Sequence, residues 1–209
     1  MSELCACPNP ATLESITDFD CPIDFSEIAK LIFSRERKFQ STTHLATPFP
    51  DPTETNIITL AEWVTTLAAV DNTKSLITPI VDDIENEPGA AITEELTTRN
   101  IITGFEPTVF TGFLAGAPQT TVESFTKLTC EKILYVFFVD SDGSIIYNLN
   151  GAVPEGFKLS NNSFFMQDLE LKKRTINKNR LGFQLEPGWS KGAKKATPVD
   201  FDALIDLTN

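Results

Sequence analysis

The stretch Ile133-Leu134-Tyr135-Val136-Phe137-Phe138-Val139 is a continuous run of apolar and aromatic residues. These residue types favour strands, and a run without polar alternation is typical of a strand that is buried on both faces. Asp140-Ser141-Asp142-Gly143 follows and predicts a turn, in which Gly143 suits a positive φ angle. Ile145-Ile146-Tyr147 then returns as a second strand. The sequence therefore predicts a central β-hairpin.

Most of the remaining chain also predicts strands, because short apolar or β-branched segments alternate with turn residues along it. The expected strands are Leu76–Ile84, Ala90–Leu96, Ile101–Phe105, Thr108–Leu114, Phe164–Leu171 and Arg180–Leu185. We therefore expect an α+β fold, with a β-rich, sandwich-like body, a few short helices and extended terminal arms.

The strongest helix prediction is Leu60–Val70, which has apolar residues at i, i+3, i+4, i+7 and i+8. We expect Trp63, Val64 and Leu67 to dock into the core. Thr59 and Glu62 predict a capping box in front of this helix.

Two further segments predict helices. Thr120 and Glu123 repeat the capping-box pattern before a shorter candidate helix. Ser26–Phe39 predicts an amphipathic helix, because its apolar residues fall on one helical face. These residues are Ile28, Ala29, Ile32 and Phe39, and the charged residues expected mostly outward are Glu27, Lys30, Arg35 and Glu36.

The chain divides into three expected parts. Residues 1–50 would form an N-terminal arm with one amphipathic helix, 51–197 the β-rich body, and 198–209 a C-terminal arm. Prolines at positions 48, 50 and 52 predict a rigid, extended linker after the first part. In the C-terminal arm we expect Val199, Phe201 and Leu204 to pack into a groove.

Charge is distributed unevenly within a net charge of -12. Residues 41–131 contain thirteen acidic and three basic side chains, a balance of -10. The basic segment, residues 172–195, contains eight basic side chains against Glu186, a balance of +7. Such a segment is either a solvated face or a docking stripe for an acidic protein or nucleic acid. The expected interface residues are Lys172, Lys173, Arg174, Lys178, Arg180 and Phe201.

Common catalytic patterns are absent from the sequence. His44 is the only histidine, and there is no G-x-S-x-G elbow, glycine-rich phosphate loop or His-Glu-x-x-His pair. The acid pairs Asp82-Asp83 and Glu94-Glu95 could act as general acid and base, although adjacent acids are ordinarily solvated. We expect no enzyme activity and no cofactor.

The candidate metal ligands have poor spacing. Cys5, Cys7, Cys21 and Cys130 approximate a zinc set only loosely, and the alternative is that Cys21 and Cys130 are buried as small apolar residues. Asp140-x-Asp142-Gly143 resembles the start of a calcium loop, but Gly151 stands where the loop needs glutamate. We expect a plain turn there and no bound metal.

Nothing in the sequence favours a membrane. It contains no run of about 18 apolar residues, and Met1–Pro8 lacks the basic start and apolar stretch of a secretory signal. We expect synthesis in the cytoplasm and no membrane partner. The acidity of the whole chain argues against a nucleic-acid partner.

The order of several segments resembles virion structural proteins of tailed phages and prophages of Bacteroidota, including the crAss-like group. The segments that carry this resemblance are Cys21–Lys30, Glu85–Gly89, Gly116–Thr120, Lys127–Glu131, Ile133–Gly143 and Leu181–Trp189.

The resemblance implies a non-enzymatic structural protein of the virion, made in the host cytoplasm and present in many copies. We expect a capsid-associated auxiliary (decoration or cementing) subunit that binds the major capsid protein or further copies of itself. A tail or head-fibre component is one alternative. A small-ligand or glycan-binding β domain, with Trp189 exposed as a platform, is another.

Overall fold

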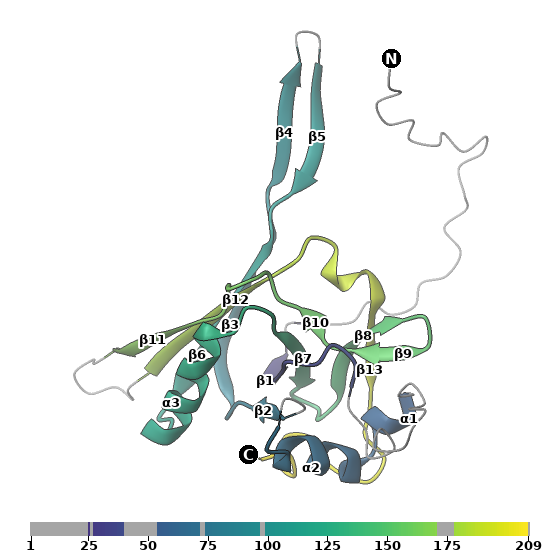
Figure 1. The fold of residues 1–209 in the computed structure, drawn as a ribbon, viewed down its shortest axis with the longest axis vertical. Helices are drawn as coiled ribbons and strands as arrows, with labels where there is room; N and C mark the ends of the chain where they lie inside the picture. Colours follow the sequence, from purple (N-terminus) through teal and green to yellow (C-terminus); the bar gives the residue numbers. More distant parts are fainter. Residues whose placement is uncertain are drawn as a thin grey trace.

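A seven-stranded antiparallel sheet is the central layer of the computed structural model, which describes residues 25, 27–39, 54–71, 74–96, 99–170 and 178–208 (Figure 1). Its main path runs β13-β8-β7-β1-β2, and the short strands β9 and β10 pair with β8 and β7. The strands of this sheet are β1 Ile28–Ser34, β2 Ser75–Ile77, β7 Tyr135–Asp140, β8 Ile145–Asn150, β9 Val153–Glu155, β10 Phe157–Lys158 and β13 Ala193–Ala196.

A second, four-stranded antiparallel sheet has the order β11-β12-β6-β3. Its strands are β3 Val81–Glu87, β6 Thr108–Ala115, β11 Phe165–Glu170 and β12 Lys178–Leu185. Leu114, Phe110, Leu181 and Phe183 from this sheet share one core cluster with side chains of the central sheet. The body is therefore sandwich-like and the fold class is α+β, as the sequence predicts.

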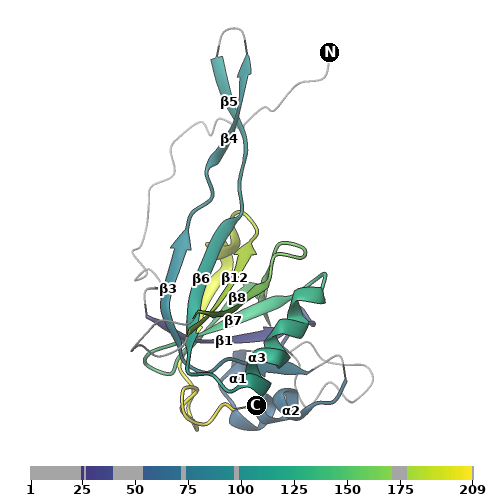
Figure 2. The same cartoon turned by 90° about the vertical axis from the view of Figure 1, so that its left-hand side faces the viewer.

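The helices α1 Glu54–Ile57 and α2 Leu60–Ala68 and the C-terminal segment cover the other face of the central sheet. The helix α3 Gln119–Thr126 and the 3₁₀ turns η2 Lys127–Cys130 and η3 Trp189–Gly192 lie on the side of the first cluster, to which Phe125 and Leu128 belong and against which Trp189 packs. Both ribbon views place the C-terminus beside α2 (Figures 1 and 2). Trp63 and Leu67 of α2 share a second core cluster with Ala203 and Leu207 of the C-terminal segment.

The central sheet separates these two clusters. In β7, Val136 and Phe138 belong to the first cluster, while Phe137 and Val139 belong to the second. Successive side chains of a strand point to opposite faces, so a strand with a core on each side needs apolar residues at every position. The burial on both faces predicted for this run is confirmed from Val136 to Val139, whereas Ile133 precedes the strand and is 43% exposed.

The predicted hairpin is also confirmed. β7 and β8 pair through Phe138↔Ile146 and Val139↔Ile145, and Gly143 has φ +79° in the connecting turn. A Cβ at Gly143 would lie 2.8 Å from the Asp202 Oδ1 atom, so the lack of a side chain at this position leaves room for the C-terminal segment to pack against the turn.

The amphipathic helix predicted over Ser26–Phe39 within the N-terminal arm is wrong. Residues Ile28–Ser34 form β1, which lies in the middle of the central sheet and pairs with both β7 and β2. Leu31 and Phe33 enter the first cluster and Ile32 enters the second. A short strand buried on both faces has apolar residues at helical spacings as well, so periodicity alone does not separate the two structures.

Lys30, expected outward, is only 7% exposed and holds the C-terminal segment. Its Nζ donates hydrogen bonds to the carbonyl oxygens of Leu204 (2.6 Å) and Leu207 (3.2 Å). Desolvation by burial lowers the pKa of Lys30. Phe201 and Leu204 pack against the second cluster as expected, but Val199 is 77% exposed, so its predicted docking is wrong.

The other expected elements mostly form, with local differences. Pro79 lies in the break between β2 and β3, which the sequence predicted as one strand. Both capping boxes are wrong: Thr59 makes no side-chain capping bond, and α3 begins after Pro118, which places Thr120 inside its first turn. Val64 is 51% exposed and does not dock into the core.

Trp63 is the largest fully buried side chain of α2, and its Nε1 donates to the Ile57 carbonyl oxygen at 2.7 Å. We predict that Trp63→Ala lowers the free energy of unfolding by about 3–5 kcal/mol, because it leaves a cavity beneath the sheet. Val64→Ala is the control and should change it by no more than about 0.5 kcal/mol. Urea unfolding measures both, and equal midpoints for the two variants would contradict the assigned packing of α2.

Candidate interaction surfaces

A β-hairpin projects from the body and is the most conspicuous surface feature (Figures 1 and 2). We call it the hairpin arm, formed by β4 Ala91–Leu96 and β5 Arg99–Phe105. These strands form a two-stranded sheet of their own. At about 3.3 Å per residue, strands of this length extend about 20 Å beyond their base.

The base of the arm is closed by a tight backbone contact. Glu106 N donates to the Ala90 carbonyl oxygen at 2.9 Å. A Cβ at Gly89 would lie 1.7 Å from the Glu106 carbonyl oxygen, so only glycine fits without moving the strands apart. The arm therefore leaves the body from a defined position.

A β-bulge gathers apolar side chains on one face of the arm. The register pairs Ala91 with Phe105 and Thr93 with Ile102, which leaves Thr103 as the extra residue. Because directly opposed residues share a face, Phe105 and Ile102 lie on the same side as Ala91 and Thr93. Phe105 is 55% exposed and Ile102 is 63% exposed.

The exposure of Phe105 and Ile102 distinguishes the arm from a hairpin whose apolar side chains pack into the body of its own chain. A two-stranded hairpin without further packing is at best marginally stable in water. Large apolar side chains that remain exposed together commonly mark a site of protein contact. The arm therefore has the character of a segment that is completed by another surface.

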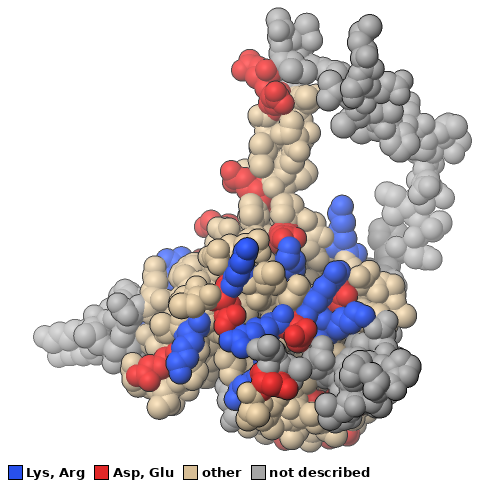
Figure 3. All heavy atoms as spheres, viewed as in Figure 1, with Lys and Arg blue, Asp and Glu red and all other residues tan. Residues whose placement is uncertain are grey.

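The arm and its stem are also acidic. Residues 85–106 contain five glutamates and one basic residue, Arg99, a net charge of -4. Glu94 and Glu95 are exposed on β4. Acidic side chains follow the arm in Figure 3, whereas Lys and Arg side chains gather over the body on the same face.

A basic groove is the second surface. It has a volume of about 420 Å³ and lies among β8, β10 and η3. The residues that line it are Arg37, Asn148, Leu149, Asn150, Phe157, Lys158, Glu186, Pro187, Gly188, Trp189, Lys191 and Gly192.

The charged side chains of the groove are three cations and one anion, so its lining carries +2. Arg37 Nε lies 2.8 Å from Glu155 Oε2, and Lys158 Nζ lies 2.6 Å from Glu186 Oε1. Lys191 is exposed and has no ion pair within the described part of the chain.

Trp189 gives the groove a rigid wall. Its ring centroid lies 4.9 Å from Phe25, 5.3 Å from Phe110 and 5.3 Å from Phe157. The side chain is half-buried against the first core cluster, so the exposed Trp189 platform expected from the sequence is wrong.

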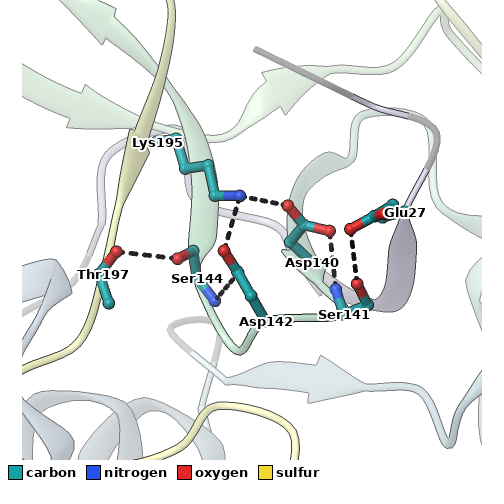
Figure 4. Close-up of polar contacts among 7 residues, drawn as sticks. All are labelled: Glu27, Asp140, Ser141, Asp142, Ser144, Lys195 and Thr197. Atoms are coloured by element: carbon teal, nitrogen blue, oxygen red, sulfur yellow. Dashed lines mark hydrogen bonds and ion pairs between the residues drawn. The ribbon is translucent and has the colours of Figure 1, made fainter.

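A polar cluster at the β7–β8 turn accounts for the sequence that resembles a calcium loop (Figure 4). Lys195 Nζ lies 2.5 Å from Asp140 Oδ2 and 2.9 Å from Asp142 Oδ2. Ser144 N donates to Asp142 Oδ1 at 2.8 Å, which is a turn contact. The lysine ammonium thus stands between the two carboxylates, and no group of three possible metal ligands occurs among the described residues.

The pKa shifts in this cluster follow from the same contacts. The hydrogen bond from Lys195 lowers the pKa of Asp142, and the hydrogen bond to Asp140 raises the pKa of Lys195. Asp140 is 1% exposed, so its charge depends on Lys195 for compensation. The cluster fixes β13 to the end of the β7–β8 hairpin.

The structure divides the basic segment instead of presenting it as one stripe. Lys178 and Arg180 belong to β12 of the four-stranded sheet, whereas Lys194 and Lys195 belong to β13 of the central sheet. Lys178 Nζ lies 3.0 Å from Asp83 Oδ2 and 5.4 Å from the Phe113 ring centroid.

Arg180 is exposed, and Phe201 is half-buried in its own chain. Lys172, Lys173 and Arg174 lie outside the described residues.

The remaining candidate residues do not converge in the described structure. Asp82-Asp83 belongs to β3 and Glu94-Glu95 to the hairpin arm, and neither pair lines the groove. Cys130 is exposed, so the expectation that it is buried is wrong. Cys5, Cys7, Cys21, His44 and the linker at Pro48–Pro52 lie outside the described residues.

Comparison with models of known protein families finds no match, and no curated protein matches the chain. Among the helices that the structure describes, none has the length and apolar character that crossing a membrane requires. The two surfaces therefore have to be interpreted from their own chemistry.

We predict that Lys195→Met lowers the free energy of unfolding by about 1–3 kcal/mol, because it leaves the buried Asp140 carboxylate without its charged donor. Lys194→Met, on the same strand but exposed, is the control and should be nearly neutral. Chemical unfolding at neutral pH measures the difference. Equal losses in the two variants would show that the cluster does not support the fold.

The stability difference between the wild type and Lys195→Met should depend on pH in a defined way. The lowered pKa of Asp142 means that its contribution is present above the ordinary Asp pKa and is lost as pH falls through the folded value. The raised pKa of Lys195 means that its contribution is present below the ordinary Lys pKa and is lost as pH rises through the folded value. The difference should be flat between about pH 4 and pH 10. Thermal unfolding across pH measures it, and a difference that grows in acid would contradict the assignment.

Proposed function

We propose that the chain is a non-enzymatic structural subunit of a tailed-phage virion that acts through protein–protein contacts, as a capsid-associated auxiliary subunit. The hairpin arm is the observation that carries the contact role. It extends from a closed base, exposes Phe105 and Ile102, and pairs only with itself among the described strands. The assignment to a virion rests on the resemblance of the sequence segments described above.

The rigid body supports this role because it can position the arm. Gly89 and Glu106 set the exit of the arm from β3 and β6, and β6 pairs with β12 along eight residues. A projecting element on a firmly paired sheet can reach a neighbouring subunit without ordering a long loop, which reduces the entropy lost on binding. Subunits of a shell need such contacts in fixed directions.

A glycan-binding domain is the second candidate, and the basic groove is the observation that favours it. Asn148 and Asn150 provide polar groups beside the wall formed by Trp189. The volume of about 420 Å³ falls in the range of small-molecule sites. Binding of neutral oligosaccharides to the isolated chain, with loss in Trp189→Ala, would favour this function over the structural one.

We predict that deletion of residues 91–105 abolishes incorporation into phage particles while the body remains folded. The ends of the deletion are already adjacent, because Glu106 N donates to the Ala90 carbonyl oxygen at 2.9 Å. Thermal unfolding of the deleted chain should give a midpoint close to that of the wild type. Quantitative mass spectrometry of gradient-purified particles then measures the copies of each chain.

A matched control is Val199→Ser, which changes an exposed apolar side chain outside the arm. It should enter particles as the wild type does. Normal incorporation of the arm-deleted chain would contradict the proposed role of the arm. Absence of the wild-type chain from particles would contradict the virion assignment itself.

A further inference from the structure

We propose that the hairpin arm of one copy docks into the basic groove of a second copy, so that subunits associate head to tail. This inference rests on the proposed function and names the partner of the arm. It commits to a second copy because both halves of the contact are present in one chain.

Charge is the first argument. The arm and its stem carry -4, and the lining of the groove carries +2. Figure 3 shows acidic side chains along the arm, and Lys and Arg side chains over the body, where acidic side chains lie among them. Opposed potentials of this kind steer association and set the register of a contact.

The apolar groups also match. The arm presents Phe105 and Ile102 on one face, and the groove offers Trp189, Leu149 and Pro187 among its cations. Burial of large apolar side chains supplies affinity, while surrounding charged pairs supply specificity. The face that carries Phe105 also carries Glu95, because residues 91, 93 and 95 alternate regularly on β4.

This placement argues against a symmetric contact between two arms. Burial of the Phe105 face against its own copy would set two acidic arms against each other, each carrying -4 with its stem, and like charges repel. An arm-to-groove contact instead places Glu95 near lysine. Docking of the arm into the groove of its own chain is also excluded, because the arm points away from the body in both ribbon views (Figures 1 and 2).

A head-to-tail contact is heterologous, so each copy keeps one open arm and one open groove. Association then continues until a ring closes, or it forms an open filament. The wild-type chain should therefore form species larger than a dimer as its concentration rises. These species should dissociate as salt increases, since exposed charge pairs are screened.

The test uses two double variants of the full chain. The arm variant is Glu94→Lys with Glu95→Lys, and the groove variant is Lys158→Glu with Lys191→Glu. Lys158 pairs only with the exposed Glu186 among the described residues, so its loss should leave the fold intact. The control is Lys127→Glu with Lys132→Glu, which reverses two exposed lysines outside the groove. Thermal unfolding verifies that all three remain folded.

Sedimentation velocity at low salt measures association. Each of the first two variants should weaken self-association by about tenfold or more, and the control should behave as the wild type. A chain with both double changes should recover association, since the signs are again opposed. An equimolar mixture of the arm variant and the groove variant should associate again, because each arm then meets a groove of opposite charge on the other variant.

Failure of that mixture to associate, or unchanged association of either variant alone, would overturn the proposal. A monomeric wild type at low salt would do so as well. These failures are separate from failure of the proposed function. A wild-type chain that is monomeric in solution but enters particles through its arm would leave the virion role standing, with another protein as the partner.

Discussion

The pairing of β1 with β7 is the constraint on which the rest of the structure depends. Leu31 lies opposite Phe138, Ile32 opposite Phe137, and Phe33 opposite Val136. Because side chains alternate along both strands, this register supplies apolar groups to both faces of the central sheet. A shift by one residue would exchange the two sets and would turn Lys30 away from the C-terminal carbonyl groups that its ammonium binds. The four-stranded sheet on one face, and α2 with the C-terminal segment on the other, both pack on this pair.

The hairpin arm, in contrast, leaves its apolar side chains exposed. Every other large group of apolar side chains described above is enclosed, whereas Phe105, Ile102 and Ile92 (47% exposed) remain exposed on a pair of strands that no other described element covers. The free energy available from burying them is not used in folding and is therefore available for binding. Its tight base, at Gly89 and Glu106, limits the directions in which that binding can occur.

The sequence predicted those parts of the fold in which local chemistry agrees with the tertiary setting. The buried strand that follows Ile133, the turn at Gly143 and the helix that carries Trp63 form as expected. The sequence predicts a helix where β1 forms, because burial on both faces removes the alternation of apolar and polar residues that identifies a strand. The cations of the basic segment are close in the sequence but do not form one surface in the structure. Lys195, for example, is neutralised by Asp140 and Asp142, and the spacing of the residues could not indicate this pairing. The two strands of the arm were predicted, but their separation from the body depends on the path of the chain at Gly89, which is a tertiary property.

Hydrogen exchange of the backbone amides in β4 and β5 tests most directly the claim that the arm is completed by another protein. Amides in a hairpin without further packing open readily, whereas amides in a buried interface are protected. In the dilute, isolated chain, the arm should exchange much faster than β7, which lies inside the central sheet. In the assembled state, the arm should become strongly protected while β7 changes little. Equal exchange of the arm in both states would contradict the account.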